Sequence, residues 1–238
     1  MIVEVGASTG NLMAFNKRTG QRVWASQSKD AAGHTGGPVP ITVEGVPCVA
    51  VLTLHHLLVV RIDGEHAGKT IAEYPWSTEF ANNIATPAVH ADCVLITSAY
   101  NHNAICKLRI TLQGAKRLWE APHASGVCTP IVHRGHVYWA SQKFFCLDYE
   151  TGKLAWSGGS FGDAGSCILT ADERLIVWGK HGKLALVETA SRSGGRYQEL
   201  AVRDSLFATD VWPHVVLSSG RLFLKDRNGS LACFQAGR

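Results

Sequence analysis

The strongest constraint on the fold is an internal repeat of roughly 43 residues that runs along the chain. The first apolar run of successive units begins near Pro40, Pro87, Pro130, Cys167 and Pro213, at steps of 47, 43, 37 and 46 residues. A short turn and a second apolar run follow in each unit. Apolar runs of this length between turn residues are typical of strands, so each unit is predicted to build one antiparallel sheet.

Glycine-containing turns mark a further hairpin inside the units. Thr9-Gly10-Asn11, His181-Gly182-Lys183 and Asn228-Gly229-Ser230 each separate two apolar runs, and such triplets favour tight strand reversals. Four strands per unit at this period predict an all-β fold, a β-propeller of four-stranded antiparallel blades. We expect about five to six blades, all within a single domain over residues 1–238.

Each end of the chain is predicted to supply only three strands. They are expected near residues 2–5, 12–16 and 22–25, and near 214–217, 221–225 and 231–235. Four complete units between them bring the total to 22 strands. An incomplete ring is therefore one expectation, and its unpaired strand edges would favour association with another chain. The oligomeric state stays open.

A polar turn followed by a tryptophan recurs after the third strand of a unit. Asn16 and Asp148 are expected to accept hydrogen bonds from the turn backbone, and Gly20 and Gly152 to adopt positive φ. The tryptophans of these units offer large flat surfaces for packing between neighbouring blades, and they are Trp24, Trp119 and Trp156.

These turn and tryptophan positions resemble the PQQ-like, or quinoprotein-type, β-propeller repeat. The resemblance covers essentially the whole chain and is closest to the C-terminal part of PQQ-like propellers of bacterial cell envelopes, including Tyr74-Pro75-Trp76. It implies a periplasmic or cell-envelope location. Such relatives usually carry a signal peptide and further N-terminal blades; here Met1 is followed at once by a strand-like segment with no signal peptide visible, so the chain alone leaves the location unknown.

Composition and charge narrow the classes of partner. Hydrophobic residues make up 46% of the chain and charged residues 18%, which is ample for a packed core. The net charge of +4 is spread over single Lys and Arg residues, which argues against nucleic acid as a partner. The longest apolar stretch, Val46 to Val60, is too short for a transmembrane segment.

The resemblance raises the question of a quinone cofactor. Enzymes with this repeat are similar to one another in holding pyrroloquinoline quinone and calcium with the help of two adjacent cysteines, and no two cysteines are adjacent here. We therefore expect neither PQQ nor calcium and no catalytic residues. The cysteines and histidines have no spacing that suits zinc, so no metal site is expected. Cys106, Cys146 and Cys233 share one slot of the repeat and are expected to be small buried hydrophobes, without disulfides.

Loops that join the last strand of one blade to the first strand of the next gather on one face of a propeller, where ligands commonly bind. The polar residues of these loops are the candidate ligand-binding set: His34, Thr35, Glu79, Asn82, Asn83, His123, Ser125, Asp163 and Asp210. The leading hypothesis is a non-catalytic binding or scaffold module whose partner is another protein or an envelope polysaccharide. The alternative is a quinone-dependent sugar or alcohol dehydrogenase-like enzyme whose site is degenerate or incomplete in this chain.

Overall fold

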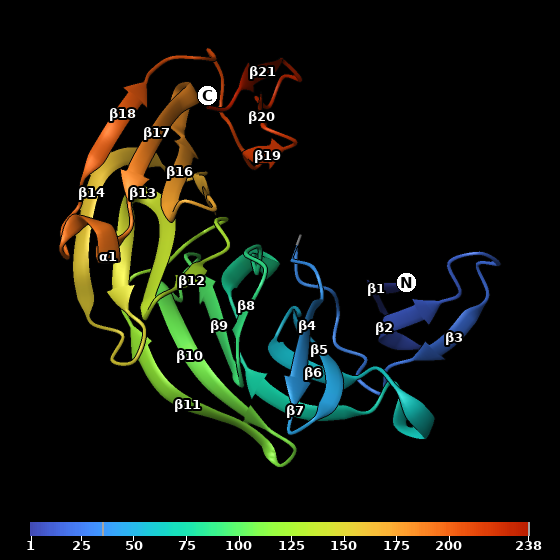
Figure 1. Cartoon of the computed structure of the whole chain (residues 1–238). Coiled ribbons are helices and arrows are strands. Elements are labelled where there is room, and N and C mark those ends of the chain that lie inside the picture. Colours follow the sequence, from blue (N-terminus) through green and yellow to red (C-terminus); the bar gives the residue numbers. More distant parts are fainter. Residues whose placement is uncertain (35, 238) are drawn as a thin grey trace. The chain divides into compact units, whose positions relative to one another are not determined.

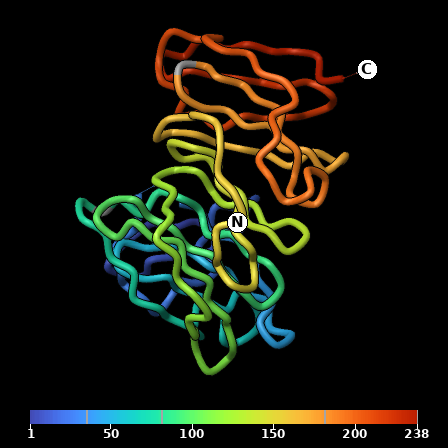
Figure 2. The backbone as a smooth tube through the Cα atoms, turned by 90° about the vertical axis from the view of Figure 1, so that its left-hand side faces the viewer, coloured from blue at the N-terminus to red at the C-terminus, as the bar shows by residue number. Residues whose placement is uncertain are grey.

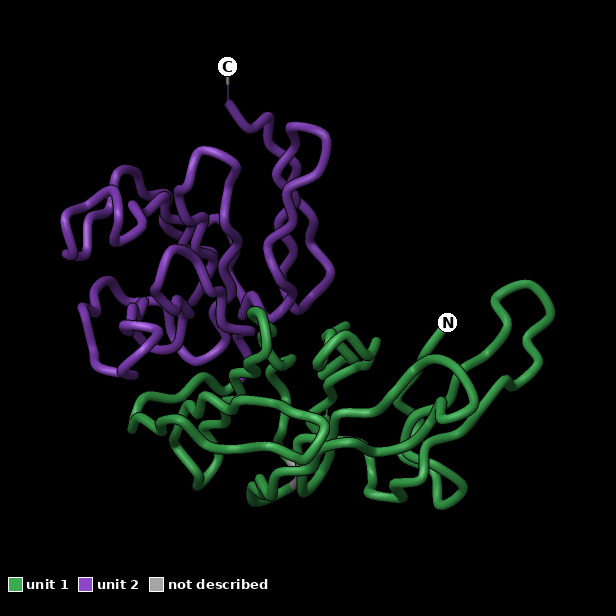
Figure 3. The backbone as a smooth tube through the Cα atoms, turned by 60° about the horizontal axis from the view of Figure 1, so that its bottom comes forward, with its two compact units in different colours: residues 1–126 green, residues 127–238 purple. Residues whose placement is uncertain are grey.

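A computed structural model describes residues 1–34 and 36–237, and within these residues the strands form six antiparallel sheets (Figure 1). The chain divides into two compact units, residues 1–126 and 127–238 (Figure 3), and each unit contains three of the sheets. In every sheet the strands follow one another in chain order. This arrangement confirms the predicted all-β fold of propeller-type blades.

The first unit contains sheets A, B and C. Sheet A consists of β1 (Ile2–Ala7), β2 (Gly10–Phe15) and β3 (Arg22–Ala25). Sheet B consists of β4 (Val39–Val43), β5 (Val46–Leu52), β6 (His56–Arg61) and β7 (Thr70–Pro75). Sheet C consists of β8 (Ala88–His90), β9 (Cys93–Ser98), β10 (Ala104–Thr111) and β11 (Gly114–Ala121). Two short 3-10 helices, η1 (Gly64–His66) and η2 (Glu79–Ala81), lie in the connections.

Sheet B is buried on both faces, which explains why its central strands are almost continuously apolar. Side chains of a strand alternate between the two faces of its sheet. Val49 and Val51 of β5 pack in one cluster with Leu12 of sheet A. Ala50 and Leu52, the alternate residues, belong to a second cluster that includes residues of sheet C. The apolar layers between sheets therefore form the core of this unit.

The second unit contains sheets D, E and F. Sheet D consists of β12 (Ile131–His133), β13 (His136–Asp148) and β14 (Leu154–Gly162). Sheet E consists of β15 (Ser166–Leu169), β16 (Arg174–Gly179), β17 (Lys183–Glu188) and β18 (Glu199–Arg203). Sheet F consists of β19 (Val216–Ser218), β20 (Arg221–Lys225) and β21 (Leu231–Gln235). The helical segments are η3 (Lys180–Gly182) and α1 (Ala190–Ser193).

Sheets E and F of this unit lie side by side, as the orange and red strands of Figure 2 show. Trp178 of β16 packs in one buried cluster with Leu222 and Leu224 of β20 and with Val211 and Val215 from the preceding loop. The same principle of apolar layers between sheets therefore holds in this unit.

β13 is a folded hairpin. Its rings Trp139 and Phe145 stack with centroids 5.2 Å apart, whereas six residues of extended strand would separate them by about 20 Å. The chain reverses at Gln142, whose φ is 51°. Sheet D thus contains four strand segments, which accounts for 21 observed strands in the described residues against the 22 expected.

The polar turns adopt the geometry that the sequence indicates. Asp148 Oδ1 accepts hydrogen bonds from the backbone N and the Oγ1 of Thr151, both at 2.7 Å, and Asn16 Oδ1 accepts from Arg18 N at 2.9 Å. The hydrogen bonds from Thr151 lower the pKa of Asp148. Gly20 and Gly152 have φ of 74° and 69°.

The tryptophans that follow these turns contact the neighbouring sheet of their own unit. Trp156 of β14 packs against Tyr197, which precedes β18, with ring centroids 5.6 Å apart. In the first unit, Trp24 of β3 lies over Gly68 of the β6–β7 connection, where an added Cβ would be 3.4 Å from the indole. Trp119 lies in β11 and is half-buried.

One cysteine departs from the expectation. Cys106 and Cys146 are fully buried, and burial raises the pKa of each thiol to about 12. Cys233, predicted to be equally buried, is exposed. In β21 it is opposite Phe223 of β20, whereas the alternate residues Leu222 and Leu224 belong to the cluster shared with sheet E, so Cys233 lies on the other face of sheet F. None of the helices within the described residues has the length and apolar character needed to cross a membrane.

Candidate binding pocket

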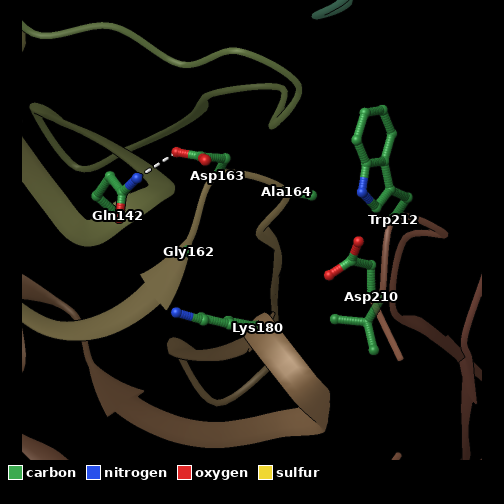
Figure 4. A pocket seen from close by; sticks show the side chains of 8 residues that line it. Gln142, Gly162, Asp163, Ala164, Lys180, Asp210 and Trp212 are labelled. Carbon is green, nitrogen blue, oxygen red and sulfur yellow. Dashed lines mark hydrogen bonds between the residues drawn. The ribbon is translucent and has the colours of Figure 1, made fainter. Parts of the chain in front are cut away.

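A small pocket in the second unit collects side chains from four separate segments (Figure 4). These segments are the turn of β13, the loop after β14, η3 and the loop between β18 and β19. The pocket has a volume of about 210 Å³ and is lined by Gln142, Gly162, Asp163, Ala164, Lys180, Asp210, Val211 and Trp212. It is smaller than the roughly 300–1,000 Å³ of typical small-molecule sites, which favours a single side chain or sugar ring as its occupant.

Backbone geometry sets one side of the pocket. Because the chain reverses at Gln142, this side chain reaches Asp163, and its Nε2 donates a hydrogen bond to Asp163 Oδ1. Gly162 has φ of 68°, and a Cβ there would lie 2.7 Å from Lys180 Cβ. A glycine is therefore required for the lysine to lie over the end of β14.

Hydrogen bonds to the β20–β21 turn hold the other side. Arg227 N donates to the carbonyl of Asp210 at 2.8 Å, and Thr209 Oγ1 donates to Asp226 Oδ2 at 2.8 Å. Burial alone would raise the pKa of Asp226, but the hydrogen bonds that it accepts lower it. Since Val211 is anchored in the core at 1% exposure, the loop that carries Asp210 is fixed at several points.

Trp212 forms an open aromatic edge of the pocket. Its side chain is 46% exposed, and the guanidinium carbon of Arg227 lies 5.4 Å from the indole centroid. Among the lining residues, Asp163 and Asp210 supply two carboxylates against the one ammonium of Lys180, and the guanidinium of Arg227 adds a second cation at the indole edge. Carboxylates beside an indole bind cationic side chains through ion pairs and cation–π contacts, and they also accept hydrogen bonds from sugar hydroxyls.

The structure brings together two residues of the predicted ligand-binding set, Asp163 and Asp210. Sequence reasoning missed Gln142, Lys180 and Trp212. Gln142 and Lys180 lie outside the loops that join successive blades, and no sequence signal places them near Asp163. Trp212 lies two residues after Asp210 and could have been found by extending that loop by two residues.

Asn83 and Ser125, also in the predicted set, are interior residues of the first unit. Both side chains are fully buried. Asn83 Nδ2 donates to the carbonyls of Thr53 at 2.9 Å and Trp76 at 3.2 Å, and its Oδ1 accepts from Ser98 Oγ at 2.8 Å. These contacts satisfy the loop backbone and leave no exposed surface of Asn83 for a ligand.

The other members of the predicted set lie in the first unit or outside the described residues. His34 and Glu79 are exposed, whereas Asn82 and His123 are partly buried. His34 N donates to the carbonyl of Asn83 at 3.0 Å, and Glu79 N donates to Asn101 Oδ1 at 2.7 Å. Thr35 lies outside the described residues. Binding by these residues stays a prediction.

A second polar cluster in the first unit surrounds Asp30. His55 Nδ1 lies 2.7 Å from Asp30 Oδ1, His56 Nδ1 lies 3.0 Å from Oδ2, and Thr53 Oγ1 donates to Oδ2 at 2.5 Å. Burial would raise the pKa of Asp30, but these hydrogen bonds hold it well below its ordinary value. From the sequence the two histidines look like solvated turn residues, because their partner lies 25 residues earlier. Asp30 is thus saturated with donors from the adjacent sheet, which favours a structural role.

Comparisons with known proteins agree with this architecture. The model of a family described as "Outer membrane protein assembly factor BamB" matches residues 1–158. The crystal structure of BamB from Moraxella catarrhalis superposes with a TM-score of 0.65 at 14% identity, covering 99% of this chain and 72% of that chain. The computationally designed Ika4 protein superposes with a TM-score of 0.51 at 12% identity, covering 68% of this chain and 96% of that chain. A search of curated proteins found no match.

Proposed function

Because the chain belongs to the family described as outer membrane protein assembly factor BamB, we propose that it is a non-catalytic β-propeller module that binds a protein partner in the cell envelope. The proposed role is that of a scaffold in outer-membrane protein assembly. Because the solved BamB structure is only 14% identical to this chain, the likeness shows the fold alone. The proposed binding function is therefore argued from the pocket itself.

The pocket of Asp163, Asp210 and Trp212 is the observation that carries the proposal. Its two carboxylates and indole fit the guanidinium or ammonium of an arginine or lysine on a partner. Fixed acidic and aromatic side chains at a small pocket are typical anchor points of protein interfaces. The pocket's position at the turns and loops that join strands and blades also fits the usual binding face of a propeller.

The experiment measures binding of the purified chain to purified outer-membrane protein assembly subunits of the same organism by biolayer interferometry. We expect D163N/D210N and W212A each to weaken binding at least about tenfold, since each removes a central anchor. D172N is the matched control, because Asp172 is an exposed aspartate of the same unit outside the pocket.

Two results would contradict the proposed binding of a protein partner through this pocket. One is that D163N/D210N binds the assembly subunits as tightly as the unmutated chain does, which would place the interface elsewhere. The other is binding to soluble envelope polysaccharide fragments alone, which would favour the polysaccharide alternative. Turnover of an alcohol or sugar after addition of quinone and calcium would overturn the non-catalytic role itself.

A further inference from the structure

Two cysteines from neighbouring sheets meet in the interior of the second unit. Cys128 lies just before β12 of sheet D, and Cys167 is the second residue of β15 of sheet E. Their Sγ atoms are 3.8 Å apart, and the side chains are 1% and 7% exposed. The two cysteines occupy different slots of the repeat, unlike Cys106, Cys146 and Cys233, which share one slot.

The backbone around the pair fixes this approach. Ala140 N of β13 donates a hydrogen bond to Cys128 Sγ at 3.4 Å. Directly before β15, a Cβ on Gly165 would lie only 2.6 Å from Ala140 Cβ, so glycine is needed for β15 to lie against β13. Ser166 Oγ accepts a hydrogen bond from Val215 N at 3.1 Å and holds the start of β15 from its other side.

From this geometry we propose that Cys128 and Cys167 are a modification site that forms an intramolecular disulfide by exchange with a disulfide-containing oxidant. A disulfide has an S–S length of about 2.05 Å, so the sulfurs must approach by roughly 1.8 Å. Rotation of the two side chains about χ1 moves their sulfurs over distances of this size. The bond would tie sheets D and E together across 39 residues of chain.

The thiol–disulfide exchange takes place in two steps. The Cys128 thiolate, its proton lost to solvent, attacks one sulfur of the oxidant, and the other oxidant sulfur leaves as a thiolate. Deprotonated Cys167 then attacks Cys128 Sγ, and the second oxidant sulfur leaves. The cysteines lose two electrons and two protons, and the oxidant becomes two thiols.

The electrostatics of the pair assign these roles. The hydrogen bond between the two sulfurs, aided by the one that Ala140 N donates, lowers the pKa of the Cys128 thiol although burial opposes it. The same hydrogen bond and burial raise the pKa of Cys167. Thiolate is the attacking species in exchange. Because both residues are buried in the folded chain, the exchange takes place late in folding, when the two sulfurs have met and these hydrogen bonds have formed but the pair is still open to the oxidant.

The test is refolding of the purified chain in oxidised glutathione, with a parallel sample in reducing buffer. After denaturation, we expect thiols available to a maleimide to fall from seven to five. Trypsin should release residues 118–134 and 154–174 as one disulfide-linked species, because each of these peptides holds a single cysteine of the pair. C167A should abolish this species, whereas C146A, which removes another buried thiol of the same unit, should retain it.

Seven reactive thiols after oxidative refolding would overturn the proposal, and so would a cross-link between any other two cysteines. The thiol count and the peptide map of the unmutated chain distinguish these outcomes even if C167A fails to fold. Oxidised protein should also melt at a higher temperature than reduced protein, a difference that C146A keeps and C167A loses.

Discussion

Replacing Asn83 with alanine tests whether this residue is a structural hub of the first unit. The variant would remove the donor to the carbonyls of Thr53 and Trp76 and the acceptor for the Ser98 hydroxyl. All three bonds are buried. The Ser98 hydroxyl would keep only the hydrogen bond that it accepts from Trp76 Nε1 at 3.0 Å.

The size of the effect follows from these unsatisfied groups. Each buried polar group left without a partner costs about 1–3 kcal/mol. Three such groups at the lower end give a loss of about 3 kcal/mol in the free energy of unfolding. For a chain of this length, about 2–4 °C of melting temperature accompanies each kcal/mol, so the N83A variant should melt roughly 6–12 °C below the unmutated protein.

Urea unfolding followed by tryptophan fluorescence measures this loss, with the N82A variant as the matched control. Asn82 is the adjacent residue and is partly buried, and its replacement should change stability by no more than about 0.5 kcal/mol. A loss below about 1 kcal/mol for N83A would refute the hydrogen-bond argument. Unchanged stability combined with weaker partner binding would restore Asn83 as a ligand contact.

Three further variants probe other parts of the structure. Burial raises the pKa of Glu4 from 4.5 to about 7, so folding favours the neutral carboxyl. The contribution of Glu4 to the free energy of unfolding is therefore fully present below about pH 4.5 and is lost as the pH rises through 7. Between pH 5 and 8 the free energy of unfolding should therefore fall by about 1 kcal/mol less in E4Q than in the unmutated protein, after allowance for solvent screening. The same pH profile for both proteins in urea titrations would contradict this. G165A should cost about 1–3 kcal/mol, because the new Cβ meets Ala140 Cβ at 2.6 Å; calorimetry showing no change would exclude the clash. Y138F should cost about 1–2 kcal/mol, because the phenol accepts a hydrogen bond from buried Ala190 N at 3.0 Å; equal urea midpoints would show that the amide finds another partner.

Local features of the fold were predictable from the sequence because each depends on a few consecutive residues. The turn at Asp148 and Gly152 needs only an acceptor, a short spacing and a residue that tolerates positive φ. Four strands were expected in the unit that contains Gln142, but no turn was predicted at this residue, because no glycine marks it. Such features recur with the repeat and so could be recognised more than once.

The binding pocket and the cysteine pair were less accessible to sequence reasoning. Asp163 and Asp210 were found because both lie in loops between blades, but their proximity depends on how sheets D, E and F pack within the unit. The meeting of Cys128 and Cys167 likewise depends on a close approach at Gly165. Polarity in a loop did not distinguish exposed Asp210 from buried Asn83, because loop backbone also needs buried hydrogen-bond partners.

The pairing of each strand only with its neighbours in the chain has a consequence for folding. Among the described strands, the residue partners farthest apart in sequence are Gln142 and Gly162, separated by 20 residues. Every backbone ladder therefore closes only a short loop. The entropic cost of bringing segments distant in sequence together arises mainly when the sheets pack against each other. A chain emerging from the ribosome can complete the ladder of each sheet before the next sheet is synthesised, and the contacts between sheets, such as that of Trp156 with Tyr197, come afterwards.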